Sequence, residues 1–341
     1  MRLLILTQAV DTNDQALGFF HGWIAAFSSE CELVDVICLK EGIHSLPENV
    51  QVHSLGKEQG VSRLTYIIRF YSYIWRLRNE YDAILVHMNQ EYVLLGAPLW
   101  KLFGKRMYLW RNHYAGSFST TVAVALSTKV FCTSSFSYTA KFKKTKLMPV
   151  GVDTSTFKPL SGERKSSSIL FLARFAPSKH PDTLLEAIER LEKSKVTYSA
   201  SFYGSAEPQN RTYRNELIEK SQMRGLSAYF FEGIPNAETP RIYNAHEIFV
   251  DLSASGMYNK TIFEAAACGC LVLAASEDFA KLVDQRFTFK GNDGDDLAAK
   301  LKSIFSLSET EKNAARSMLK LIVEKNDLDT LCTRLLEEMR N

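Results

Sequence analysis

Short apolar runs alternate with stretches of helical periodicity along the whole chain of 341 residues. This alternation predicts parallel β-sheets covered by helices on both faces, which places the chain in the α/β class. Six runs in each half have the length and composition of buried strands. They are residues 3–7, 34–39, 83–88, 107–110, 130–133 and 147–150 in the first half, and 169–173, 199–203, 229–232, 248–252, 271–275 and 287–289 in the second.

A polar segment, residues 153–168, separates the two sets of strands and contains Pro159, Ser161-Gly162 and three consecutive serines. The length of the chain suits two domains of about 150 residues each. We therefore predict two Rossmann-like, doubly wound parallel-sheet domains facing a cleft, residues 1–152 and 153–325. A closing helical pattern over residues 309–339 is interrupted near Asn326-Asp327.

Composition excludes several classes of protein. A formal charge of +3 is too small to suggest a nucleic-acid partner. The six cysteines lie mostly in apolar segments and form no C-x-x-C pair, which is typical of reduced core residues in a reducing compartment. The first residues are predicted to form a strand rather than a signal peptide, and no apolar run approaches about 20 residues. We expect a cytoplasmic protein.

The segment from Ser253 to Ser276 predicts an anion site. An apolar strand leads into a small-residue loop, then a helix over residues 261–268 that Gly269 ends, then another strand. Amides at the start of such a helix are unpaired and attract negative charge, which suits a diphosphate. The candidate contacts are Met257, Tyr258, Asn259, Lys260 and Thr261. Glu264, one turn inside the helix, is placed to accept hydrogen bonds from hydroxyls of the same ligand.

A second anion signal lies between the strand at residues 169–173 and the helix that Pro181 begins. Arg174 and Lys179 share this loop, at the carboxyl edge of a parallel sheet where α/β proteins bind ligands. A guanidinium and an ammonium are the usual complement of a pyrophosphate.

Arg174 and Lys179, Glu264 before A-A-A-C-G, and M-P-V-G-V-D-T-S-T-F at residues 148–157 together resemble the retaining glycosyltransferases of family 4 (glycosyl transferases group 1), which have the GT-B fold. The resemblance covers essentially the whole chain and is tightest over residues 147–276. It implies transfer of a sugar, with retention, from a UDP- or GDP-sugar to a glycan, lipid-linked or small-molecule acceptor, as in the synthesis of cell-envelope polysaccharide. It also implies that residues 326–341 cross back to the first, acceptor-side domain.

The resemblance assigns roles to particular residues. Arg174 and Lys179 would hold the diphosphate, Glu264 the ribose, and His113 would orient the sugar. The loops at Gly204 and Gly233 would approach the nucleotide through main-chain atoms. Polar residues at strand ends of the first domain are acceptor candidates, with a purely local structural role as the alternative for each: Asp11, Asp14, His87 and Asn89. No Asp-x-Asp metal motif is evident, so we expect no cofactor and no metal, the nucleotide sugar being a substrate.

The sequence departs from the family pattern in two places. The family has two glutamates eight positions apart, and Gly256 stands eight before Glu264. The family's Gly-Gly loop after the first strand is also missing. A nucleotide-sugar 2-epimerase of the same fold, and a nucleotide-sugar-binding protein with impaired catalysis, therefore remain as alternatives.

Residues 61–78 combine aromatic side chains with arginines, and residues 141–146 are basic. Such segments dock proteins weakly on anionic lipid. The near-continuous apolarity of residues 61–78 also fits a helix buried against the sheet. We expect the buried helix, with weak peripheral membrane contact as the alternative.

Overall fold

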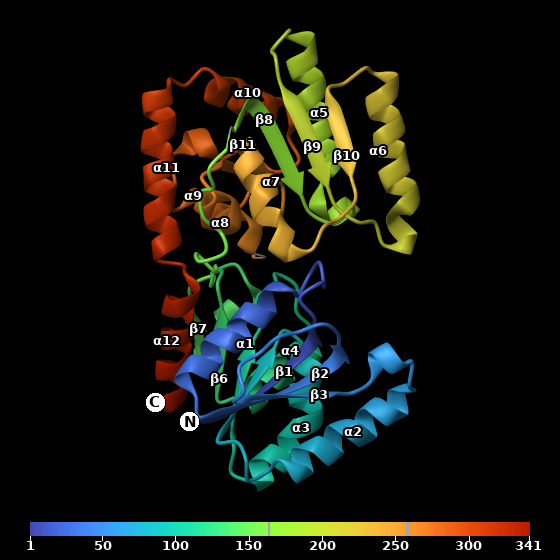
Figure 1. Ribbon diagram of the computed structural model, residues 1–341, viewed down its shortest axis with the longest axis vertical. Helices are drawn as coiled ribbons and strands as arrows, with labels where there is room; N and C mark the ends of the chain where they lie inside the picture. The colour runs from blue at the N-terminus through green and yellow to red at the C-terminus, as the bar shows by residue number, and fades with distance from the viewer. Residues whose placement is uncertain (163, 257–258) are drawn as a thin grey trace. The chain divides into compact units, whose positions relative to one another are not determined.

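The computed structural model describes residues 1–162, 164–256 and 259–341, which divide into two compact units (Figure 1). Unit 1 comprises Met1–Gly151, Pro235–Ala237 and Leu328–Asn341. Unit 2 comprises Val152–Ile234 and Glu238–Asp327. The last helix of the chain is therefore part of unit 1.

Unit 1 contains a parallel sheet in the strand order β3-β2-β1-β4-β5-β6-β7. Because β1 is followed by β2 on one side and by β4 on the other, the order reverses between β1 and β4. Its strands are β1 (Arg2–Val10), β2 (Leu33–Glu41), β3 (Val50–Ser54), β4 (Ala83–His87), β5 (Arg106–Trp110), β6 (Lys129–Cys132) and β7 (Thr145–Leu147). Its helices are α1 (Phe19–Glu30), α2 (Arg63–Arg76), α3 (Gln90–Leu102), α4 (Phe118–Leu126) and α12 (Leu328–Arg340).

The central strands of unit 1 are buried on both faces, and alternate residues face opposite helix layers. Leu3 and Ile5 pack in one apolar cluster with α1 and α12. Leu4 and Leu6 pack in the other, with α2, α3 and α4. The continuous apolar runs in the sequence reflect this two-sided burial.

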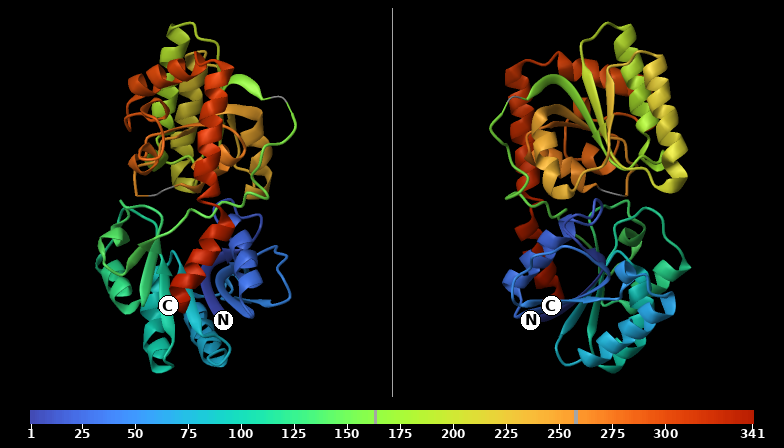
Figure 2. Two further views of the ribbon diagram at one scale, coloured as in Figure 1. Left: turned by 90° about the vertical axis from the view of Figure 1, so that its left-hand side faces the viewer. Right: turned by 45° about the vertical axis from the view of Figure 1, so that its right-hand side comes forward.

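Unit 2 contains a parallel sheet in the order β10-β9-β8-β11-β12, which reverses between β8 and β11. Its strands are β8 (Lys165–Leu172), β9 (Ser199–Tyr203), β10 (Ala228–Phe231), β11 (His246–Asp251) and β12 (Leu271–Ala274). Its helices are α5 (Pro181–Lys193), α6 (Arg211–Met223), α7 (Thr239–Ala245), α8 (Lys260–Ala267), α9 (Glu277–Ala280), α10 (Gly294–Phe305) and α11 (Glu309–Glu324). Helices cover both faces of this sheet (Figure 2): α5, α6 and α10 pack on one, while α7, α8 and α11 pack together on the other.

Local signals in the sequence are reproduced by the structure. Pro181 is the first residue of α5, where its missing amide hydrogen costs nothing. Gly269 follows α8 with φ 86°, a left-handed conformation that favours glycine. The closing helical pattern is divided into α11 and α12 at the interruption that the sequence predicts. All six cysteines are buried thiols that form no disulfide among the described residues.

Two strand predictions need correction, and one strand was not predicted. Residues 147–150 do not form a strand: β7 is Thr145–Leu147, and Met148 and Val150 are buried after the chain has left the sheet. Residues 287–289 form only an isolated bridge, between Thr288 and Ala274. The edge strand β3 has no counterpart among the predicted strands. A run of apolar residues indicates that a segment is buried. Inside a sheet a buried segment is usually a paired strand, but at the edge of a sheet burial and strand pairing need not coincide.

The predicted polar linker, residues 153–168, is shorter than expected because β8 begins at Lys165. The expectation of a buried helix over residues 61–78 is wrong for one of its faces. In α2 only Phe70 and Ile74 are buried, and several large apolar side chains are exposed. No helix among the described residues has the length and apolarity needed to cross a membrane.

Candidate functional site

The two anion motifs of the sequence meet in unit 2, where the strand order reverses between β8 and β11. The loop after β8 carries Lys179, and the loop after β11 carries Ser253. Lys179 Nζ donates a hydrogen bond of 3.1 Å to Ser253 Oγ. Crevices at such reversals are the usual ligand sites of open parallel sheets. Burial lowers the pKa of Lys179, an effect that the charge of Asp251 opposes.

A polar network fixes this meeting point. Asp251, the last residue of β11, accepts hydrogen bonds from Ser253 N at 3.0 Å and from Asn259 Nδ2 at 2.7 Å. Asn259 Nδ2 also lies 2.6 Å from Ser253 Oγ. The network therefore holds the loop that leads into α8 and positions the Lys179 ammonium beside it.

Helix α8 begins at Lys260, and its N-cap residue, Asn259, makes no side-chain cap. The Asn259 amide donates to Asp251 and Ser253 instead, and the start of a helix attracts negative charge. Lys260 and Thr261, two of the predicted contacts, are half-buried at this first turn. The predicted contacts Met257 and Tyr258 lie outside the described residues.

Gly256, which stands where the family has its first glutamate, has φ 87°. This left-handed conformation favours glycine, so the departure from the family pattern accompanies a particular loop geometry. The Gly256 amide donates to Asp278 Oδ2 at 3.3 Å, and Asp278 is itself buried.

Glu264 is 3% exposed, and its Oε2 accepts a 3.3 Å hydrogen bond from the hydroxyl of Tyr243 on α7. Burial, followed by the charge of Glu264, raises the pKa of Tyr243 well above its usual value. Tyr243 therefore stays protonated and orients the Glu264 carboxylate. No local pattern in the sequence points to this partner, because Tyr243 comes from another helix.

The other predicted residues of unit 2 lie in loops after strands. Arg174 follows β8 and forms an exposed ion pair of 2.6 Å with Glu207. Gly204 follows β9, and an added Cβ there would lie 1.9 Å from the Ala173 carbonyl oxygen, so close chain packing requires this glycine. Gly233 is half-buried in the loop after β10.

In unit 1 the strand order reverses between β1 and β4, and Asp11 follows β1. Asp11 is buried; it accepts from Asn13 N at 3.0 Å and pairs with Lys40 at 3.1 Å. Burial opposes ionisation of Asp11, but these two contacts outweigh it and lower its pKa. Asp14 instead accepts hydrogen bonds from the amides of Ala16 and Leu17, the local role left open above.

At the end of β4, His87 is buried, with its ring stacked on Phe20 at a centroid distance of 4.0 Å. Its Nδ1 lies 3.4 Å from Thr7 Oγ1. Met88 has φ 66°, an uncommon value for a bulky residue and one that turns the chain sharply at the sheet edge. Asn89 is the N-cap residue of α3 without a side-chain cap.

His113 lies in the loop after β5, half-buried and stacked on Tyr114 at 4.6 Å. Its Nδ1 accepts from the Ala115 amide at 2.9 Å. A backbone N–H can only donate, so in the neutral ring the proton lies on Nε2, which becomes a hydrogen-bond donor. Arg111 beside it donates to the Ala115 carbonyl, and its Nε is buried without a partner among the described residues.

Sequence reasoning thus missed Asp251, Ser253 and Tyr243, the residues that hold the predicted ones in place. Asp251 ends an apolar run, which was a usable signal, since a polar residue at the carboxyl end of a central strand lies at the ligand edge. No group of three or more His, Cys, Asp or Glu side chains with metal-binding geometry occurs among the described residues.

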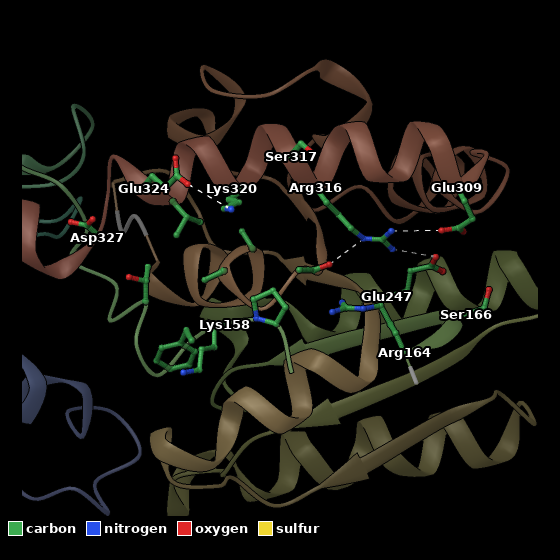
Figure 3. A pocket seen from close by; sticks show the side chains of 17 residues that line it. Lys158, Arg164, Ser166, Glu247, Glu309, Arg316, Ser317, Lys320, Glu324 and Asp327 are labelled. Carbon is green, nitrogen blue, oxygen red and sulfur yellow. Dashed lines mark hydrogen bonds and ion pairs between the residues drawn. The ribbon is translucent and has the colours of Figure 1, made fainter. Parts of the chain in front are cut away.

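A pocket of about 840 Å³ lies elsewhere in unit 2, between residues 154–166, the end of α8 and α11 (Figure 3). None of the predicted site residues lines it. Arg164 donates to the carbonyl of Cys268 and Arg316 to that of Gly269, so both cations complement the carboxyl end of α8. The anion-binding end of this helix is about 12 Å away at 1.5 Å per residue. We therefore assign the pocket no part in the nucleotide site.

Glu247, which lines this pocket, belongs to a buried ion pair, and this pair allows a prediction about stability. Lys312 Nζ lies 2.8 Å from Glu247 Oε1, with the two side chains 7% and 4% exposed. We expect Lys312→Met to lower the free energy of unfolding by about 3 kcal/mol, because the buried carboxylate then keeps the Ser167 amide at 2.7 Å but no cation closer than Arg316 at 3.9 Å. Urea unfolding measures the change. Lys320→Met, at a side chain 78% exposed, is the control and should change stability by less than about 0.5 kcal/mol. Equal effects would contradict the prediction.

The family model described as Glycosyl transferases group 1 matches residues 153–319, nearly all of them in unit 2. The chain is 27% identical over 194 residues to the GtfA subunit of UDP-N-acetylglucosamine–peptide N-acetylglucosaminyltransferase from Streptococcus parasanguinis, covering 54% of this chain and 36% of the relative. It is 25% identical over 149 residues to D-inositol 3-phosphate glycosyltransferase from Segniliparus rotundus, covering 40% and 33%. The chain thus matches about a third of the length of these relatives.

Two solved structures resemble the whole chain. Anabaena Alr3699/HepE, in complex with UDP-glucose, has a TM-score of 0.80 at 18% identity and covers 100% of both chains. Sucrose-phosphate synthase from Thermosynechococcus elongatus has a TM-score of 0.77 at 15% identity, covering 100% of this chain and 98% of that one. At these identities the likeness shows the fold.

Proposed function

Residues 153–319 form a glycosyl transferases group 1 domain in a chain of GT-B fold, and from this premise we propose that the protein is a retaining glycosyltransferase that uses a UDP-sugar. UDP is favoured over GDP because UDP-glucose is bound in the HepE structure and UDP-N-acetylglucosamine is named for the streptococcal relative. The acceptor is a glycan, a lipid-linked sugar or a small molecule.

The observation that carries this proposal is the hydrogen bond between Lys179 and Ser253. Two motifs more than 70 residues apart, each able to bind phosphate, lie together at the strand reversal of unit 2. A half-buried ammonium and the start of α8, which has no side-chain cap, converge there on one position. A nucleoside diphosphate is the ligand class that uses both, and Glu264 behind them suits a ribose.

In the proposed reaction the bond between the sugar C1 and the UDP oxygen breaks, and a bond from an acceptor oxygen to C1 forms on the same face. The acceptor proton leaves with the diphosphate or to water. Lys179 and the amides of α8 stabilise the charge that develops on the diphosphate, which we propose happens without a metal ion. Residues of unit 1, His113 first among them, act on the sugar and the acceptor.

A thermal-shift panel of UDP, GDP, ADP and their glucose and N-acetylglucosamine conjugates tests the donor. A ligand at 100 times its Kd adds about 2.7 kcal/mol to the stability of the folded state, a clear rise in Tm. We expect UDP and its conjugates to give this rise. No shift with any nucleotide contradicts the proposal. A UDP shift without sugar transfer to any acceptor favours the impaired binding protein, and conversion of the free nucleotide sugar to its 2-epimer favours the epimerase. An inverted anomer in the product, seen by NMR, contradicts retention.

Glu264 provides a separate prediction about the ribose. We expect Glu264→Gln to weaken UDP binding about 10- to 100-fold, the effect of losing a hydrogen bond to a charged group. The variant should also lose the discrimination of the natural protein against 2′,3′-dideoxy-UDP. Titration calorimetry with both nucleotides measures this. Tyr243→Phe is the control, since it removes only the donor that orients the carboxylate and should have the smaller effect. Unchanged discrimination in Glu264→Gln would exclude the ribose contact.

A further inference from the structure

Helix α2 has a second apolar stripe in addition to the one that packs on the sheet. Phe70 and Ile74 face the core, whereas Leu64, Ile68 and Trp75 are 66%, 61% and 55% exposed. Their spacing of four and seven residues places the three on one face of the helix. Isolated surface apolar residues are ordinary, but a continuous stripe of large ones marks an interaction surface.

The stripe continues onto the neighbouring helix α3, which runs beside α2 in unit 1 (Figures 1 and 2). The Tyr71 hydroxyl donates to the Leu95 carbonyl at 3.0 Å, and the Trp75 ring packs edge-on against Phe103 at 5.8 Å. These contacts place exposed side chains of α3 beside those of α2. The surface, called the α2–α3 face below, comprises Leu64, Ile67, Ile68, Trp75, Leu95 and Leu102.

The charges around the α2–α3 face have one predominant sign. Helix α2 contains three arginines and no acidic residue. Arg76 lies over the Tyr73 ring, Arg78 over the Trp75 ring, and Lys101 is exposed next to Leu102. The nearest acidic residues in sequence are Glu80, after the end of α2, and Glu91, one turn before Leu95 on α3.

We propose that the α2–α3 face docks the protein on an anionic lipid surface. Exposed aliphatic side chains and one tryptophan enter the interface, while the surrounding cations meet lipid phosphates. Trp75 with Arg78 stacked on it suits the headgroup level, where amphipathic aromatic rings accumulate. A second copy of this chain is less compatible, because it would bring the same cations together. The proposal rests on unit 1 alone and does not depend on the proposed transferase activity.

Trp75 makes the test direct, because the other three tryptophans, Trp23, Trp100 and Trp110, are at most 4% exposed. The full chain is mixed with vesicles of phosphatidylcholine containing about one third phosphatidylglycerol, at low salt. We expect the protein to co-sediment, Trp75 emission to shift to shorter wavelength, and brominated lipids to quench it. Vesicles of phosphatidylcholine alone should bind much less, and salt at about 1 M should release the protein, since it screens surface charges.

Two variants with matched controls separate the apolar and charged parts. Ile68→Glu and the double variant Arg76→Glu/Lys101→Glu should each reduce vesicle binding about tenfold or more. Leu321→Glu, at a residue 60% exposed on α11, and Lys193→Glu/Lys320→Glu in unit 2 make the same changes elsewhere and should bind like the natural protein. Circular dichroism checks that all four variants are folded. No co-sedimentation at low salt, or equal loss in variants and controls, would overturn the proposal. Self-association that Ile68→Glu abolishes, without vesicle binding, would assign the face to a second copy.

Discussion

Lys179→Ala is expected to weaken UDP binding about 100-fold and to leave the fold intact. The ammonium is half-buried at the strand reversal of unit 2, where partial desolvation lowers its pKa. A hydrogen bond from such a cation to phosphate contributes about 1.5–3 kcal/mol, and the upper end of that range corresponds to roughly 100-fold in Kd. Ser253 Oγ keeps its contact with Asn259, so the polar network survives the loss of Lys179.

Titration calorimetry gives the two dissociation constants, and thermal unfolding without ligand reports on the fold. Lys193→Ala, at the exposed last residue of α5, removes the same charge far along the helix that follows Lys179 and should bind UDP normally. Lys179→Arg should recover part of the affinity, because it restores the charge with a different shape. Equal Kd values for the natural protein and Lys179→Ala would show that the diphosphate does not bind at Lys179.

His113→Ala is expected to lower sugar transfer by about 100-fold or more and to leave UDP affinity unchanged. The Ala115 amide fixes Nδ1 as an acceptor, so Nε2 presents a proton in the neutral ring. We propose that this donor stabilises charge developing on the sugar in the transition state. Loss of one such preorganised donor costs about 100- to 1,000-fold in kcat.

The separation of binding from turnover is the readout that a structural role would not produce. His113→Gln keeps a donor on a side chain of similar reach and should retain more activity than His113→Ala. Tyr114→Ala, beside it in the same exposed loop, removes only the ring stacked on the imidazole and should have a smaller effect. Full turnover in His113→Ala would show that the residue only stabilises its loop. A loss of UDP affinity in parallel with the loss of turnover would mean that the loop is disordered in the variant.

The predicted burial of the helix over residues 61–78 shows how the same residues support different conclusions from sequence and from structure. Their apolarity alone fits a helix buried on all sides. The structure resolves it into two stripes, one on the core through Phe70 and Ile74, and one exposed through Leu64, Ile68 and Trp75. The composition of the segment says how many of its residues are apolar. Which of these residues are buried depends on how α2 packs against the sheet and α3.

The sequence by itself determined the α/β class, ten of the twelve predicted strands and the ends of key helices. These features depend on interactions between near neighbours: Pro181 suits the first turn of a helix, and Gly269 suits a left-handed helix end. Two-sided burial of central strands also leaves a plain mark, because every position in the run must be apolar. Segments at the edge of a sheet leave no such pattern. For this reason β3 was not predicted, and residues 147–150 were wrongly predicted to form a strand.

Only the tertiary structure decided how the candidate site is built. The contact between Lys179 and Ser253 joins residues 74 positions apart, and the bond from Tyr243 to Glu264 joins two helices. Such contacts depend on the order of strands in the sheet, which no local pattern of hydrophobicity contains. The sequence therefore identified the charged groups that suit a nucleotide, and the strand reversal between β8 and β11 brought them to one place.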